Sequence, residues 1–179
     1  MEKGLGLSKN IVVTGPESTG KTNIASHLSK KLNCIWVPEY ARTYVEKLHR
    51  PYTYEDVEHI AKKQIHDYMY FTKRYRILIF DTWLIITKVW FDKVFGKHPH
   101  WLDEKIKNLK IDFYLLCAPD LEWVPDPVRE NGGEIRKELF QIYEKEIRSL
   151  AVPYGIVKGE GQKRYITAEE IMAKYLQKL

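Results

Sequence analysis

Two patterns of apolar and polar residues run along this chain, and together they predict its secondary structure. Short continuous apolar runs are typical of strands that are buried on both faces of a sheet. These runs occupy residues 9–14, 34–39, 77–81, 112–118 and 154–159. Apolar residues spaced three and four apart predict amphipathic helices. The helical stretches are residues 21–32, 40–49, 51–74, 83–96 and 134–150, with a last helix that we expect to begin at a capping box between Thr167 and Glu170.

The predicted strands and helices alternate, which favours an α/β fold with a parallel sheet of about five strands and helices on both faces. No repeat, low-complexity segment or linker divides the chain, so we expect a single domain over residues 1–179. One segment breaks the pattern. Residues 119–136 contain three prolines and two glycines and cannot be regular throughout, so we interpret residues 118–136 as a lid or mobile loop.

Composition and charge exclude only a few classes of function. The chain has 179 residues, 30% of them charged, and a formal net charge of +5, with basic and acidic residues interspersed. Because no basic stripe appears, nucleic acid is not an expected partner. Cys34 and Cys117 lie in apolar runs without a CxxC pair, so we expect buried, reduced thiols. No signal-peptide core and no apolar run of the roughly 18 residues that span a bilayer occur, so we expect no membrane partner and a cytoplasmic location.

The most informative motif lies between the first strand and the first helix. The stretch GPESTGKT matches the phosphate-binding pattern GxxxxGKS/T, with a predicted strand before it and a helix after it. In this pattern backbone N–H groups surround a phosphate, the lysine reaches the β- and γ-phosphates and the hydroxyl binds Mg²⁺. The alternative is a chance match in a glycine-containing turn. The nucleotide-binding residues predicted here are Gly15, Glu17, Ser18, Thr19, Gly20, Lys21 and Thr22.

Two carboxylates follow apolar strands. Asp81 closes the third strand and would hold Mg²⁺ opposite Thr22; an N-cap for the next helix is a compatible alternative. Glu39 ends the second strand, and ligands of open parallel sheets collect at the carboxyl ends of strands. A carboxylate there can accept the proton of a substrate hydroxyl as it attacks the γ-phosphate, although the start of a helix with an acidic first turn is the alternative. Tyr40 and Arg42 extend this corner.

The irregular segment and the C-terminal region supply further candidates. A nucleotide lid requires cations over the transferring phosphoryl group and an aromatic ring over a flat ligand. The lid candidates are Trp123, Asp126, Arg129 and Arg136. Arg164, with Gly159 and Gly161, follows the last strand, where the adenine would lie; a plain surface turn is the alternative. We assign Arg129 to catalysis, and Arg136 and Arg164 to nucleotide binding.

We expect the histidines to be solvated or structural and most of the remaining tyrosines to pack. None of the six histidines has a cysteine or carboxylate partner at metal-ligand spacing. Several tyrosines cluster in the middle helices, and we expect most of them to pack while one or two reach a substrate pocket. They are Tyr44, Tyr52, Tyr54, Tyr68 and Tyr70.

Four motifs, in order, resemble one known family. GPESTGKT, VPEYAR, IFDTW and WVPDPVR are similar to the motifs of the ribosylnicotinamide kinase domain of bacterial NadR-type proteins, and the resemblance covers nearly the whole chain. The first motif is widely shared among nucleotide-binding proteins, whereas the EYxR corner and the lid motif are more specific. The resemblance implies transfer of the γ-phosphate of ATP, with Mg²⁺, to the 5′-hydroxyl of nicotinamide riboside, which gives nicotinamide mononucleotide.

The same resemblance implies residue roles. Residues 15–22 would bind the triphosphate, Asp81 would serve magnesium and the sugar, and Glu39 with Arg42 would face the riboside. Trp123 would stack on the nicotinamide, since a flat cation is attracted to an aromatic face. NadR-type proteins also carry a DNA-binding helix-turn-helix and a nucleotidyltransferase domain. This chain begins shortly before its phosphate-binding loop, so we expect neither regulation nor adenylyl transfer. The sequence predicts no oligomeric state.

Two other functions stay open at the level of sequence. One is a kinase with the same phosphate chemistry for another nucleoside or for a vitamin precursor. The other is a switch that hydrolyses ATP and transfers nothing. The chain has no NKxD-type guanine-reading motif, and its strand-end carboxylates and lid suit a phosphate acceptor.

Overall fold

The fold is built on a single parallel sheet, as the strand pattern predicts. A computed structural model describes residues 8–125 and 131–177. Its strands pair in the order β2-β3-β1-β4-β5, and every pair is parallel. The strands are β1 (Lys9–Thr14), β2 (Ile35–Val37), β3 (Ile77–Asp81), β4 (Phe113–Cys117) and β5 (Tyr154–Val157). β1 is therefore the central strand, and the phosphate-binding loop follows its carboxyl end.

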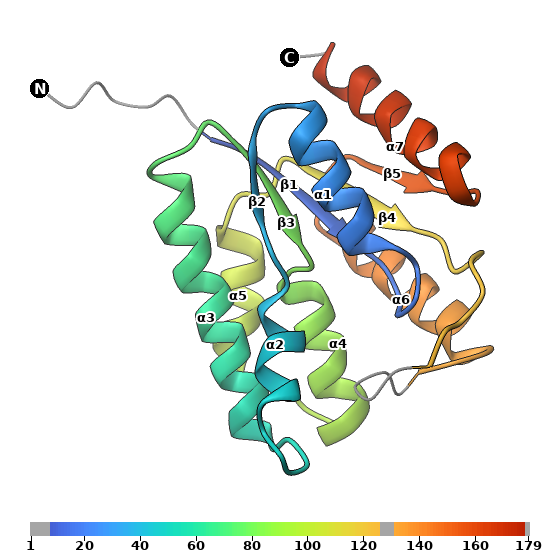
Figure 1. Ribbon diagram of the computed structural model, residues 1–179. Helices are drawn as coiled ribbons and strands as arrows, with labels where there is room; N and C mark the ends of the chain where they lie inside the picture. The colour runs from blue at the N-terminus through green and yellow to red at the C-terminus, as the bar shows by residue number, and fades with distance from the viewer. Residues whose placement is uncertain (1–7, 126–130, 178–179) are drawn as a thin grey trace, which may run out of the picture.

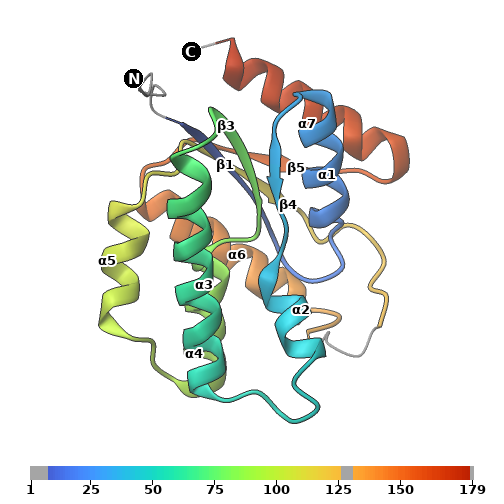
Figure 2. The same ribbon diagram turned by 60° about the vertical axis from the view of Figure 1, so that its left-hand side comes forward.

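Helices cover both faces of the sheet (Figures 1 and 2). One face carries α1 (Lys21–Lys31) and α7 (Gly161–Leu176). The other carries α3 (Tyr54–Thr72), α4 (Leu84–Phe95), α5 (His100–Asn108) and α6 (Ile135–Ser149), while the short α2 (Tyr40–Glu46) follows β2. This arrangement confirms the predicted α/β class.

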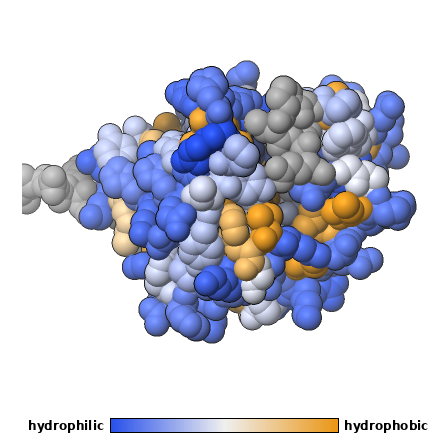
Figure 3. All heavy atoms as spheres, turned by 90° about the horizontal axis from the view of Figure 1, so that it is seen from below, coloured by the Kyte–Doolittle hydropathy of each residue, from blue (hydrophilic) through white to orange (hydrophobic). Residues whose placement is uncertain are grey.

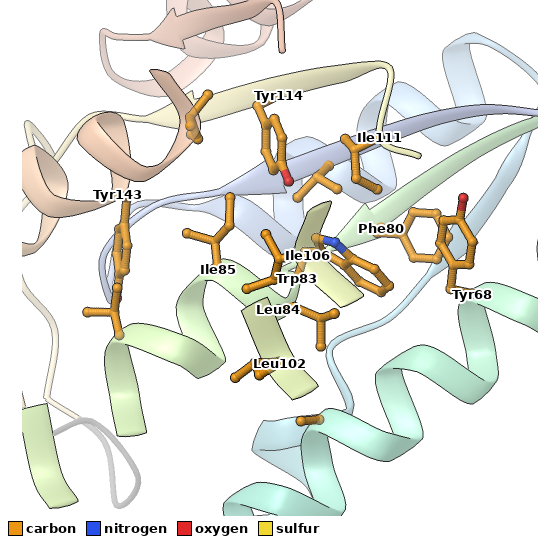
Figure 4. Close-up of a cluster of buried hydrophobic side chains, with 14 of the residues drawn as sticks. Tyr68, Phe80, Trp83, Leu84, Ile85, Leu102, Ile106, Ile111, Tyr114 and Tyr143 are labelled. Carbon is orange, nitrogen blue, oxygen red and sulfur yellow. The ribbon is translucent and has the colours of Figure 1, made fainter. Parts of the chain in front are cut away.

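The sheet separates two apolar cores, because successive side chains of a strand point to opposite faces. Ile11 and Val13 of β1 join the core under α1 and α7, whereas Val12 joins the larger core under α3 to α6. Trp83 and Tyr114 are among the largest fully buried side chains of that larger core (Figure 4). Packing on both faces fixes β1, and with it the start of the phosphate-binding loop.

The structure corrects two expectations about helices. α7 begins at Gly161, so residues 161–166 belong to the helix, and the Thr167 hydroxyl bonds the Lys163 carbonyl within it instead of capping its start. Arg164 is consequently a helical residue rather than part of a loop. The sequence analysis also missed α5, which Pro99 precedes and whose Leu102 and Ile106 are buried.

The structure can be compared with two further expectations, that both thiols are buried and that no segment spans a membrane. Both thiols are free, and burial raises the pKa of each to about 11, yet Cys117 is fully buried while Cys34 is partly exposed. The expectation of burial is thus correct for Cys117 only. Within the described residues, no helix is both long enough and apolar enough to cross a bilayer.

Candidate active site

A cavity of about 570 Å³ opens between the phosphate-binding loop, α2, α4 and the start of α6. Its floor is polar and consists of loop residues 15 and 17–22 together with Glu39. Its walls are largely apolar and include Val45, Tyr52, Ile86, Val89, Trp90, Val94, Ile135, Leu139 and Tyr143. Figure 3, which views the lower side of Figure 1, shows apolar patches among hydrophilic atoms. The cavity therefore combines a site for an anion with space for a flat, weakly polar group.

The phosphate-binding loop has a backbone shape that requires glycine at one position and left-handed residues at two others. Gly15 has φ 143°, and a Cβ there would lie 2.6 Å from the Cys117 carbonyl oxygen, so β4 excludes any side chain. Ser18 (φ 57°) and Gly20 (φ 70°) adopt the left-handed conformation. Left-handed residues in such a loop help to turn N–H groups toward one side, and the N-terminus of α1 adds its positive dipole end. The loop is thus suited to bind a phosphate.

Lys21 and Thr19 both bond to this loop. The Lys21 ammonium donates to the Pro16 carbonyl oxygen at 2.8 Å, and the Thr19 hydroxyl donates to the same oxygen at 2.8 Å. Thr19 is fully buried, so its hydroxyl stabilises the loop. Lys21 lines the cavity, where a long flexible ammonium can reach the outer phosphates of a nucleotide.

Asp81 lies at the end of β3 and is only 3% exposed. Burial raises the pKa of its carboxyl group, while the nearby Thr22 hydroxyl and the Lys21 charge act in the opposite direction. Among the described residues neither carboxylate oxygen has a hydrogen bond of good geometry. The alternative role as an N-cap is wrong, because Trp83 occupies that position of α4. An unbonded carboxylate beside a hydroxyl fits a divalent cation, which would draw its remaining ligands from phosphate and water.

Glu39 forms part of the cavity floor and immediately precedes α2. Its pKa is raised by burial and by the negative charges of Asp81 and Glu17, against the opposing charges of Lys21 and Arg42. As the N-cap residue of α2 it makes no capping hydrogen bond with its side chain, so the carboxylate does not serve the helix. A carboxylate with a raised pKa in a cavity is suited to act as a general base.

The structure adds cavity residues that the sequence analysis did not single out. Thr87 of α4 donates to the Gln64 side-chain oxygen at 2.9 Å, and both buried residues line the cavity. Trp90 and Tyr52 meet edge to face with ring centroids 4.8 Å apart. Tyr52 is one of the tyrosines of which we expect one or two to reach a substrate pocket, and it lines the cavity. One sequence signal could have revealed Gln64: it stands at a position of α3 where the helical spacing of Ile60, Ala61 and Tyr68 predicts an apolar residue.

Some predicted residues lie outside the main cavity. The Tyr40 hydroxyl bonds the His59 ring at 3.1 Å, and Tyr40 does not line the main cavity. Trp123 packs against Gly132 and is not among the residues that line the cavity. Arg42 does line it and pairs with Glu46. Asp126 and Arg129 fall outside the described residues. The roles assigned to all these residues stay predictions.

Comparison with known proteins identifies the family to which this chain belongs. A profile of the AAA domain family matches residues 10–164. The chain belongs to this family. It is also similar to the trifunctional NAD biosynthesis/regulator proteins NadR of Salmonella typhimurium and Escherichia coli, with 24% identity over 139 and 141 residues. The matches cover 74% of this chain and 34% of each relative, so the chain spans about a third of the length of these curated relatives.

Solved structures share the fold. A NadR protein in complex with NR has a TM-score of 0.78 and 24% identity, covering 94% of this chain and 52% of that one. Deoxyadenosine kinase from M. mycoides has a TM-score of 0.63 and 18% identity, covering 95% of this chain and 100% of that one. Thymidylate kinase from Ehrlichia chaffeensis has a TM-score of 0.69 and 13% identity, covering 93% and 98%. The chain therefore has a P-loop kinase fold, and the resemblance to NadR-type proteins is confirmed.

Proposed function

We propose that this protein transfers the γ-phosphate of ATP to the 5′-hydroxyl of nicotinamide riboside. The observation that carries the proposal is the composition of one cavity, which joins a phosphate-binding loop and a carboxylate with a raised pKa to a wall containing Trp90 and Tyr52. A positively charged, flat nicotinamide ring is a group that such aromatic side chains attract. The likeness to a NadR protein whose structure contains NR supports the same substrate.

In this proposal each part of the site has one task. The loop N–H groups and Lys21 hold the triphosphate and stabilise the charge that moves during transfer. Asp81 and Thr22 would hold Mg²⁺, which supplies further charge neutralisation when bound. Glu39 accepts the proton of the attacking hydroxyl. Gln64 offers amide hydrogen bonds from the cavity wall, and its contact with Thr87 fixes its position.

A different nucleoside is the second candidate. The Gln64 amide both donates and accepts hydrogen bonds, so it could also recognise the edge of a nucleobase. The fold shared with deoxyadenosine kinase and thymidylate kinase is compatible with this alternative. Trp90 and Tyr52 offer ring contact to a neutral base as well, although a neutral base would lack the cation-π attraction that a nicotinamide ring receives.

A substrate panel tests the proposal. Purified protein is incubated with Mg-ATP and separately with nicotinamide riboside, uridine, cytidine and deoxynucleosides, and both ADP and the phosphorylated product are measured. We expect product from nicotinamide riboside above all others. Product from another nucleoside would favour the second candidate, and ADP formation that is independent of any acceptor would indicate an ATP-hydrolysing switch.

Lys21→Ala is the active-site control for this panel, and Lys30→Ala is its matched surface control on the same helix. Removing the Lys21 ammonium takes away charge stabilisation of the transferring group and is expected to lower turnover by about 10² to 10³-fold. Lys30 is exposed, and its replacement should leave turnover unchanged. Near wild-type turnover in folded Lys21→Ala would contradict transfer at this loop.

A further inference from the structure

Four consecutive carbonyl groups of the phosphate-binding loop accept hydrogen bonds from cationic side chains. The Pro16 carbonyl accepts from Lys21 at 2.8 Å. Arg136 donates to the next two carbonyls, from Nε to Glu17 at 3.1 Å and from Nη2 to Ser18 at 3.2 Å. Nη2 of Arg164 donates to the Thr19 carbonyl at 2.9 Å. Two of these three cations come from helices distant in sequence.

Both arginines are buried and also hold neighbouring segments. Arg136, on the first turn of α6, is 5% exposed and donates from Nη1 to the Leu121 carbonyl at 2.9 Å. Arg164, on α7, is 4% exposed and bonds the carbonyls of Ala118 and Gly159 at 2.9 and 2.8 Å. Arg164 also pairs with Asp120. The loop is thus joined to the segment after β4 and to the turn before α7.

We propose that Arg136 and Arg164 are positioning residues that set the direction of the loop N–H groups without contacting the nucleotide. In a trans peptide the carbonyl of one residue and the N–H of the next point to opposite sides of the chain. Holding the carbonyls of residues 17, 18 and 19 on the outer side therefore turns the N–H groups of residues 18, 19 and 20 toward the phosphate. The two guanidinium charges also raise the positive potential around the loop.

The need for arginine follows from geometry. A guanidinium group presents several donors in one rigid plane, whereas a lysine ammonium is a point charge on a flexible chain. Arg136 uses three of its nitrogens on three carbonyls, which no single ammonium can reproduce in the same positions. This assignment replaces the expectation that both arginines bind the nucleotide directly. It rests on the proposed function only in that the loop binds a nucleotide.

Nucleotide binding in lysine variants tests the inference. Calorimetric titrations with ADP and with ATP, without any riboside, are compared for wild type, Arg136→Lys and Arg164→Lys. Arg148→Lys is the control, because Arg148 lies on the same helix as Arg136 but is exposed and pairs only with Glu144 among the salt bridges of the described residues. We expect Arg136→Lys and Arg164→Lys to lose at least about tenfold in affinity for both nucleotides alike, and the control to bind as wild type does.

Three results would overturn the inference. Unchanged affinity in both variants would show that the loop keeps its shape without the arginines. A loss confined to ATP would place an arginine on the γ-phosphate. The third result comes from steady-state kinetics, in which we expect a raised KM for ATP and an unchanged KM for the riboside. An equal rise in both KM values would indicate general structural damage instead of a misdirected loop.

A milder variant keeps the test informative if a buried arginine cannot be replaced without unfolding. Asp120→Asn removes the ion pair of Arg164 from the partly exposed side and leaves the arginine in place. We expect a smaller but again equal loss of ADP and ATP affinity, and unchanged affinity would contradict the role of Arg164. Wild-type protein that binds ADP but phosphorylates no riboside would contradict the proposed function and leave this inference intact.

Discussion

Glu39 illustrates how burial at a single residue connects chemistry with stability. Its pKa in the folded protein is raised above its ordinary value, chiefly by burial. A raised carboxyl pKa favours the folded state when the group is protonated, and this stabilisation is lost as the pH rises through the folded-state pKa. Above the folded-state pKa the ionised carboxylate therefore lowers the free energy of unfolding relative to a neutral side chain of the same shape.

Glu39→Gln tests this consequence. We expect the variant to have a higher free energy of unfolding than wild type at pH 7 to 8, and the difference to shrink toward pH 4 as the wild-type carboxyl group is protonated. Chemical denaturation at several pH values measures it. The same variant should lose turnover because it has no general base. A variant less stable than wild type at pH 7 would show that the carboxylate makes favourable bonds in the folded state.

Thr82 is a second residue whose local conformation costs free energy in the folded state. It follows Asp81, has φ 68°, and its buried hydroxyl has no hydrogen-bond partner among the described residues. A β-branched residue in the left-handed region is strained by about 1 to 3 kcal/mol, and such strain is concentrated at functional sites. Thr82 lines the active-site cavity.

Thr82→Gly and Thr82→Ala separate the strain from the side chain. Both variants remove the hydroxyl, but only glycine adopts the positive φ without cost. We therefore expect the free energy of unfolding of Thr82→Gly to exceed that of Thr82→Ala by about 1 kcal/mol in urea denaturation. The reverse order of stability would mean that the turn after β3 is not strained at this position.

At the scale of elements, α4 and α6 form two walls of the cavity, and the sequence did not predict that they would. Lys88 of α4 bonds Glu146 of α6 at 3.0 Å, and Lys93 pairs with Glu138, so the two helices are joined at two points beside the cavity. The apolar period of α4 was sufficient to predict a helix. It could not tell whether Trp90 faces the core or a cavity, because both environments favour an aromatic residue.

Trp90→Ala and Trp123→Ala compare the two candidate stacking rings. Trp90 lines the cavity, while Trp123 packs on Gly132. We expect Trp90→Ala to weaken riboside binding by roughly 1 to 3 kcal/mol, through lost ring contact and cation-π attraction, and to affect ATP binding much less. Calorimetry with riboside in the presence of a non-hydrolysable ATP analogue measures this. Loss of affinity in Trp123→Ala alone would return the nicotinamide contact to the predicted lid.

Across the whole molecule, features that are local in sequence were predictable and features that join distant segments were not. The phosphate-binding loop and the strand ends of Glu39 and Asp81 could be identified because a parallel sheet brings its carboxyl ends together. The bonds from Arg136 and Arg164 to loop carbonyls could not, since nothing in their local sequence distinguishes an arginine that holds a backbone from one that holds a phosphate. The extent of the domain, residues 1–179, stays a prediction.

Nucleotide-linked unfolding tests whether the chain behaves as that single unit. The loop is connected to α6 and α7 by buried arginines and to both cores through β1, so occupation of the loop should stabilise every element together. At free ADP of about 100 times its Kd, we expect the free energy of unfolding to rise by about 2.7 kcal/mol. Urea denaturation followed by tryptophan fluorescence and by far-ultraviolet circular dichroism should give coincident transitions that shift equally with ADP, and a smaller shift in Lys21→Ala at the same ADP concentration. Two separate transitions, of which ADP moves only one, would show that the loop and its helices unfold as a unit distinct from the rest of the chain.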